Sequence, residues 1–321
     1  MNYDVKPILV ISKCLGFEAC RYNGGIENNV FIENLRNYVD FITVCPETDL
    51  GLPIPRDTLR IVQKDDKLKL VVSKTGQDVT EKLDEFAEEF LKNLEDVDGF
   101  IFKNKSPTCG VKDAKIYTAI DKGAAIRRGK GVFVQKITNK YPNIIIEDEG
   151  RLTNFKIREH FLTRIFVLAS FRDAKKNNNK EKLKNFHLKN TLLFLAYSQK
   201  YSKLLDSLIY NDDSFNSNMV FNEYEKYLYK LLERAPRYTS NINVLLKSLN
   251  NFKDDITQEE MQFIWNTIDK YKKGLVPFSV PLYLVKGYII RFNLDYLSNQ
   301  SFFMPYPEEL IHVNDSGKLI H

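Results

Sequence analysis

The sequence lacks any apolar run close to the roughly 18 residues that a membrane-spanning helix needs. Its start, Met1 to Lys6, also lacks the apolar block of a secretory signal. Together these absences predict a cytoplasmic protein with no membrane partner. The chain is not short of core-forming residues, because 43% of its 321 residues are hydrophobic. That composition predicts a globular protein of one large or two ordinary domains.

Cysteine is scarce, and its four positions form no CxxC pair and no CxxxCxxC run. The spacing therefore does not match zinc-ribbon or thioredoxin patterns and does not by itself name a metal. A reducing compartment keeps thiols free, so we expect no disulfide framework. Metal binding or catalysis remains the leading use, although each cysteine taken singly can equally be a small buried hydrophobic residue. The cysteines are Cys14, Cys20, Cys45 and Cys109.

The charge is only mildly one-sided, at a formal net value of +5. A basic excess of this size permits an anionic partner but does not favour nucleic acid over a small anion. The basic stretch 175–189 would suit a tRNA partner, yet it carries no recognised RNA-binding motif. No repeat recurs at a fixed period, which excludes a solenoid.

Three predicted buried strands each lead into one of the cysteines. Because ligands usually bind at the carboxyl ends of strands in an α/β sheet, we expect these thiols to lie on one rim. Their placement in loops rich in glycine and proline favours a shared metal site over inert thiols, which would be expected inside strands. The strands are Ile8 to Lys13 before Cys14, Phe41 to Val44 before Cys45, and Gly99 to Lys103 before the loop Ser106 to Gly110 with Cys109.

The predicted fold is α/β, with a Rossmann-like, mostly parallel N-terminal sheet domain followed by an all-α helical bundle. The predicted divisions are a sheet domain at 1–147, a connecting helix and polar linker at 148–182, a helical domain at 183–312 and a tail at 313–321. Within the sheet domain the pattern predicts a hairpin over 60–72, a helix over 113–126 and a short strand over 131–134.

The N-terminal half carries three motifs: Ser12 to Gly16 with Arg21 to Gly25, Cys45-Pro46-Glu47 with Gly51 to Arg56, and Lys103 with Ser106 to Gly110. In this order they resemble the thiouracil desulfidase family. The rest of the chain carries Glu149 to Leu152, Phe186 to Lys189 and Pro305 to Leu310, which resemble the YbgA-type helical domain.

The desulfidase resemblance implies a 4Fe-4S cluster held by three thiolates, from Cys14, Cys45 and Cys109. It implies that Cys20 either lies behind these ligands and supports them or serves the fold. Three protein ligands leave one iron with an open position, which can act as a Lewis acid toward a soft sulfur donor. The implied activity is hydrolytic, non-redox removal of sulfur from a thiolated nucleobase such as 2-thiouracil.

Such a reaction needs groups that exchange protons with water and substrate. Glu47 is the candidate general acid or base, and Ser106 is a candidate hydrogen-bond partner of substrate or water. In the alternative interpretation, Glu47 caps a helix and Ser106 caps a turn. Arg21 and Tyr22 are candidates for contact with the substrate or the cluster sulfides, although Arg21 can equally pair with Glu47 or another carboxylate.

Two further functions fit the same residues. One is a cluster-dependent sulfur transferase or tRNA-modifying enzyme. The other is a non-enzymatic binding module that a structural metal site stabilises.

Overall fold

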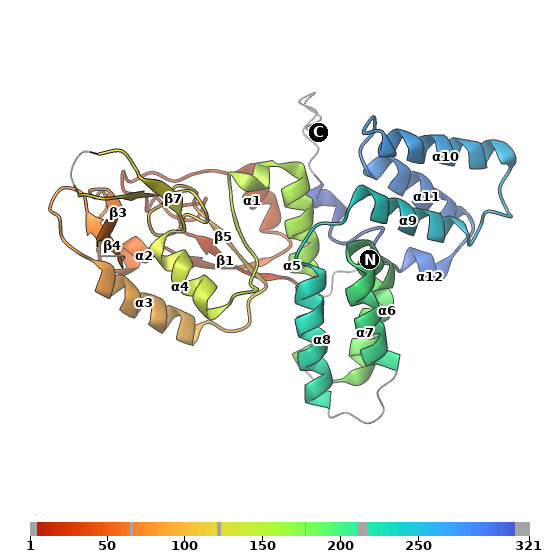
Figure 1. Cartoon of the computed structure of the whole chain (residues 1–321), viewed down its shortest axis with the longest axis horizontal. Helices are drawn as coiled ribbons and strands as arrows, with labels where there is room; N and C mark the ends of the chain where they lie inside the picture. The colour runs from red at the N-terminus through yellow and green to blue at the C-terminus, as the bar shows by residue number, and fades with distance from the viewer. Residues whose placement is uncertain (1–4, 65–66, 121–122, 177, 211–216, 312–321) are drawn as a thin grey trace. The chain divides into compact units, whose positions relative to one another are not determined.

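The computed structural model describes residues 5–64, 67–120, 123–176, 178–210 and 217–311. The predicted tail at 313–321 lies outside these residues. Contacts within the chain divide it into two units, made up mainly of Val5–Ala169 and Ser170–Glu308. Figure 1 draws both units with their helices and strands labelled. Over the residues described, no helix combines the length and the apolar character that crossing a membrane requires.

The N-terminal unit contains a four-stranded sheet in the order β2-β1-β5-β8. Every neighbouring pair in it is parallel, as predicted. β1 and β5 are buried along almost their whole length, which is typical of parallel strands covered on both faces. The carboxyl ends of the four strands therefore lie along one edge. The strands are β1 (Ile8–Ser12), β2 (Asp40–Val44), β5 (Gly99–Phe102) and β8 (Ile146–Asp148).

A second four-stranded sheet has the order β4-β3-β6-β7 and mixed directions. The predicted hairpin is confirmed as an antiparallel pair, β3 (Leu59–Lys64) with β4 (Lys67–Val72). The predicted helix over 113–126 is wrong, because β6 (Ala114–Tyr117) lies within this range and β7 (Arg127–Gly129) follows it directly. In β6 buried and more exposed side chains alternate, and this period of two fits a strand.

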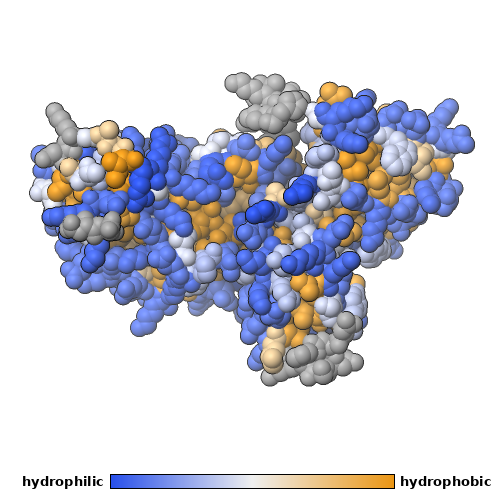
Figure 2. Space-filling model, in the orientation of Figure 1, coloured by the Kyte–Doolittle hydropathy of each residue, from blue (hydrophilic) through white to orange (hydrophobic). Residues whose placement is uncertain are grey.

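The helices that lie wholly within this unit are short except for α3 (Thr80–Asn93), which buries one face through Leu83, Ala87 and Leu91. Figure 2 shows that its outer surface is hydrophilic. α3 lies beside α4 (Val132–Lys140) in Figure 1. The remaining helices are α1 (Val30–Leu35), α2 (Pro46–Asp49) and the 3-10 turn η1 (Arg151–Thr153).

The predicted strand over 131–134 is wrong, because α4 begins there. The backbone N–H groups of Val132 and Phe133 donate to the carbonyls of Pro107 and Thr108, at 3.0 and 3.1 Å. Backbone carbonyls from a distant loop thus satisfy the first turn of the helix, where a side-chain cap is the usual sequence signal. The apolar run 132–134 is buried throughout, so it shows no helical period.

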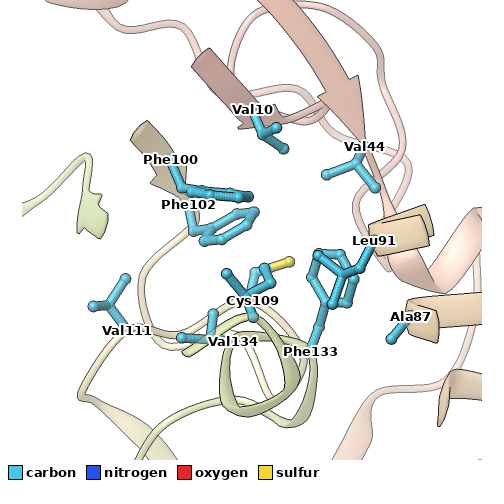
Figure 3. Packing of buried hydrophobic residues seen from close by; sticks show 11 residues of the cluster. Val10, Val44, Ala87, Leu91, Phe100, Phe102, Cys109, Val111, Phe133 and Val134 are labelled. Atoms are coloured by element: carbon cyan, nitrogen blue, oxygen red, sulfur yellow. The ribbon is translucent and has the colours of Figure 1, made fainter. Parts of the chain in front are cut away.

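The core of the N-terminal unit reaches directly to one of the cysteines. Figure 3 shows the Cys109 side chain among Phe102, Phe133 and Val134. These residues belong to one cluster of buried side chains that also contains Val10. The packing holds the loop that carries Cys109 against the body of the sheet.

The remainder of the chain is helical, which confirms the predicted all-α region. The polar run 175–182 forms the end of one helix and the start of the next, and Asn179 caps the second by accepting from Glu181 and Lys182 N–H groups. The helices are α5 (Phe155–Lys176), α6 (Lys180–Tyr197), α7 (Gln199–Tyr210), α8 (Ser217–Leu231), α9 (Tyr238–Leu249), α10 (Gln258–Lys272), α11 (Ser279–Arg291), α12 (Asp295–Ser298) and the 3-10 turn η2 (Glu308–Leu310).

Candidate functional site

The parallel sheet brings three of the thiols to one edge. Cys45 directly follows β2, Cys14 lies two residues beyond β1, and Cys109 lies in the loop after β5. Since these strands are neighbours in the order β2-β1-β5, their carboxyl ends are adjacent. All three cysteines are buried.

Cys20 lies within the same group of thiols. It is completely buried, and its side chain hydrogen-bonds with those of Cys14 and Cys45. The hydrogen bond with Cys14 is the main reason why the pKa of Cys20 rises to about 11. The hydrogen bond with Cys20, together with burial, raises the pKa of Cys45. Cys20 therefore links two of the predicted ligands.

Cys109 completes the group on the side of the β5 loop. Burial raises the pKa of its thiol to about 12, and the charges of Cys45 and Glu47 act in the same direction. The hydroxyls of Thr108 and Ser12 hydrogen-bond with its sulfur and oppose this rise. Thr108 Oγ1 lies 3.6 Å from Cys109 Sγ. Two hydroxyl groups thus lie close to the sulfur.

The raised thiol pKa values predict how the stability of the metal-free, reduced protein depends on pH. Above the unfolded value of 9.0, thiols ionise first in the unfolded chain. The stability that the protonated thiols contribute is present below pH 9 and is lost as the pH rises through about 11. We expect urea unfolding to show this alkaline loss. In a Cys20→Ala variant the free energy of unfolding should fall less between pH 9 and pH 11 than in the parent protein. An equal fall in both proteins would contradict a contribution of the Cys20 thiol to this loss.

Glu47 lies in α2, two residues beyond Cys45, and both of its carboxylate oxygens accept hydrogen bonds. Arg56 donates to Oε2 from Nε at 2.9 Å and from Nη2 at 2.7 Å. Thr108 Oγ1 donates to Oε1 at 2.9 Å. The side chain of Arg56 is only 5% exposed, and its buried Nη1 has no hydrogen-bond partner in the part of the chain that is described. A guanidinium with a spare donor thus lies beside Glu47, the carboxylate two residues beyond Cys45.

Ser106 holds the turn that carries Cys109. Its Oγ accepts from the backbone N–H groups of Thr108 and Cys109, at 3.2 and 3.0 Å. This is the capping arrangement that the alternative interpretation predicts. The same Oγ lies 2.9 Å from Thr108 Oγ1, so Ser106 is connected to Glu47 through Thr108.

Arg21 pairs with Glu27, at 3.2 Å between Nη1 and Oε2, and not with Glu47. Lys103 Nζ lies 3.2 Å from the same Glu27 oxygen and forms a second ion pair with Glu149. Burial lowers the pKa of Lys103, but the hydrogen bonds and negative charges of Glu149 and Glu27 outweigh this effect and raise the pKa. Glu149 follows β8, so this network joins loops at the same edge of the sheet.

Tyr22 is 45% exposed, and its backbone carbonyl accepts from Arg56 N–H at 2.7 Å. The structure thus connects the first cysteine loop to Arg56 through the backbone. The phenol itself remains at the surface.

The sequence analysis did not propose individual roles for four residues of this site, Ser12, Glu27, Thr108 and Gly131. Ser12 and Thr108 each stand inside one of the family motifs, so their positions carried a signal. Glu27 and Gly131 had none, because their roles depend on contacts across the fold. Gly131 is the N-cap of α4, and its N–H donates to the carbonyl of Gly110 at 2.7 Å.

Replacing Gly131 with alanine is expected to destabilise this loop. A Cβ at this position would lie 2.3 Å from Thr108 O and 2.9 Å from Cys109 N, so the backbone must shift. We expect the free energy of unfolding to fall by about 1–3 kcal/mol, the usual cost of overpacking. Chemical denaturation of Gly131→Ala and the parent protein measures this difference in the free energy of unfolding.

Gly287→Ala makes the same chemical change in α11, where an added Cβ meets nothing within 4 Å. A helix-interior glycine gains roughly 0.5–1 kcal/mol on this change. Equal stabilities of the two variants would show that the close approach of Gly131 to the loop is unimportant.

Fold and site together define an α/β protein that gathers thiols, a carboxylate and hydroxyls at the carboxyl edge of a parallel sheet. Residues 9–149 match the family described as 2-thiouracil desulfurase, and residues 191–307 match a protein family of unknown function, DUF1722. The chain belongs to the 2-thiouracil desulfurase family through its N-terminal half, with the DUF1722 region fused behind it. The predicted resemblances are confirmed.

Two relatives each match about half of the chain. YbgA of Escherichia coli (strain K12) is 28% identical over 160 residues, which are 49% of this chain and 94% of that protein. YbbK of Bacillus subtilis (strain 168) is 31% identical over 152 residues, which are 44% of this chain and 97% of that protein. A solved structure of the 4Fe-4S-dependent thiouracil desulfidase TudS is 26% identical, covers 46% of this chain and 94% of its own, and has a TM-score of 0.38.

Proposed function

We propose that this protein is an enzyme that removes sulfur from a thiolated nucleobase such as 2-thiouracil by hydrolysis, with a 4Fe-4S cluster as cofactor. The observation that carries the proposal is the gathering of thiols from remote segments beside Glu47, in a chain of the 2-thiouracil desulfurase family. The net change replaces a C=S bond with C=O. Water supplies the oxygen, sulfur leaves as hydrosulfide, and no electrons are gained or lost.

The donor set fits an iron–sulfur cluster. Thiolates are the usual ligands of such clusters, and hydroxyl donors such as those of Ser12 and Thr108 stabilise charge on sulfur. Among the residues described, no three His, Cys, Asp or Glu side chains converge as ligands of a single metal ion. In a 4Fe-4S cluster each thiolate binds a different iron. Cys14, Cys45 and Cys109 are the proposed ligands.

Cys14, Cys45 and Cys109 would hold the cluster through their thiolates, and it would supply Lewis-acid chemistry toward a thiocarbonyl. The protein supplies the proton transfer. Glu47 accepts a proton from the attacking water at Oε1, since its Oε2 is held by two nitrogens of Arg56. Ser106 fixes the turn that carries Cys109.

Further residues are proposed to line the substrate side of the site. Tyr22 offers an exposed ring at the rim, where a flat heterocycle can pack. Arg21 acts through Glu27 to position the first cysteine loop. Cys20 supports the ligands by hydrogen bonds to Cys14 and Cys45.

The proposal is tested by incubating anaerobically reconstituted protein with 2-thiouracil and measuring uracil and sulfide. Equal amounts of the two products are expected. Sulfur gained or lost by bound tRNA, with 2-thiouracil unchanged, would identify a tRNA-modifying enzyme or sulfur transferase instead. A colourless protein that contains zinc and converts neither substrate would identify a metal-stabilised binding module.

A further inference from the structure

Thr108 occupies a central position between the carboxylate and the sulfur of this site. Its side chain is almost completely buried, at 1% exposed. Its Oγ1 lies 2.9 Å from Glu47 Oε1, 2.9 Å from Ser106 Oγ and 3.6 Å from Cys109 Sγ. One hydroxyl therefore contacts the proposed base, the turn-forming serine and a proposed cluster ligand.

The hydrogen bonds around this hydroxyl have a defined direction. Ser106 Oγ already accepts from two backbone N–H groups, so both of its lone pairs are used. Its own proton is therefore directed at Thr108 Oγ1. Thr108 has a single proton, which it can donate either to Glu47 Oε1 or to Cys109 Sγ.

The acceptor that the Thr108 proton points to determines how much of Glu47 Oε1 is free to bind water. Arg56 occupies Oε2 with two nitrogens, so Oε1 is the oxygen with lone-pair capacity left. When the Thr108 proton points to Oε1, it takes up part of that capacity. When it points to Cys109 Sγ, Oε1 becomes free for a water, and the sulfur gains a charge-assisted hydrogen bond.

We propose that Thr108 is a positioning residue whose hydroxyl alternates between Glu47 and the Cys109 sulfur, and so couples the base to the cluster ligand. The catalytic part of this inference rests on the proposed desulfuration, whereas the hydrogen bond to sulfur does not. Hydrogen bonds to cluster sulfurs raise the reduction potential, because reduction adds negative charge.

The test compares Thr108→Val, which keeps the shape and removes the hydroxyl, with Thr108→Ser, which keeps the hydroxyl. Both variants and the parent protein are loaded anaerobically with the cluster. For Thr108→Val we expect a lower reduction potential and a kcat on 2-thiouracil about 10- to 100-fold lower, with little change in KM. Thr108→Ser should restore both values.

Several outcomes would overturn the inference. One is a Thr108→Val protein with the parent's potential and kcat. Another is a Thr108→Ser protein as defective as Thr108→Val, which would assign the effect to packing of the methyl group. If neither variant takes up iron, Thr108 has a structural role. If only Thr108→Ser takes up iron, the hydroxyl is required for cluster loading. If the parent protein does not convert 2-thiouracil, the proposed function fails, but the potentials still decide whether Thr108 contacts the sulfur.

Discussion

Alanine at Cys14, Cys45 or Cys109 is expected to remove most of the bound iron from the protein, whereas Cys20→Ala should retain much of it. Each of the first three residues is proposed to bind one iron, and losing a thiolate leaves that iron without its protein ligand. Iron and acid-labile sulfide per chain, measured after anaerobic purification, give the result directly.

Cys20→Ala is the matched control, because it removes a buried thiol from the same group. Cys20 hydrogen-bonds with Cys14 and Cys45, so a difference in iron content between these variants reflects iron binding and not distance from the site. If Cys20→Ala loses as much iron as the other variants, Cys20 is itself a ligand. If one of the other three keeps the iron of the parent protein, the proposed ligand set is wrong at that position.

Glu47→Gln is expected to lower kcat by about 10²- to 10⁴-fold while leaving the iron content unchanged. Glutamine keeps the size of the side chain but cannot take a proton from water. Its amide must also meet either Arg56 or Thr108, both of which donate hydrogen bonds to this position. Uracil formation from 2-thiouracil and iron per chain are the two measurements.

Glu88→Gln is the control for this variant, because Glu88 is exposed on the outer face of α3. It should behave as the parent protein does. Activity of Glu47→Gln within a fewfold of the parent would exclude Glu47 as the base. Loss of iron together with activity would instead give Glu47 a role in holding the loops around the cluster.

The local sequence pattern predicted the three strands of the first sheet that lead to cysteines. The strands that lead to Cys14, Cys45 and Cys109 are buried apolar runs followed by loops rich in glycine or proline, and both signals lie within a few residues. In the second sheet only the β3–β4 hairpin was predicted, and β6 and β7 were not. β6 and β7 are only four and three residues long. β6 pairs with β3, which lies far along the chain, and β7 pairs with β6, so both strands depend on a long-range contact that local pattern does not reveal.

The crossings between the two sheets explain where the site lies. The segment from β2 to β3 carries Cys45, Glu47 and Arg56, and the segment from β5 to β6 carries Thr108 and Cys109. The sequence indicated Glu47 because it lies two residues from a cysteine. It could not indicate the hydrogen bonds of Glu47 to Arg56 and Thr108, which are 9 and 61 positions away.

Iron and acid-labile sulfide in the unaltered protein, purified without exposure to air, test the account most directly. The account predicts brown protein with about four iron and about four sulfide per chain, the content of one 4Fe-4S cluster. Protein that binds zinc, or that takes up no iron when iron and sulfide are supplied anaerobically, would contradict it.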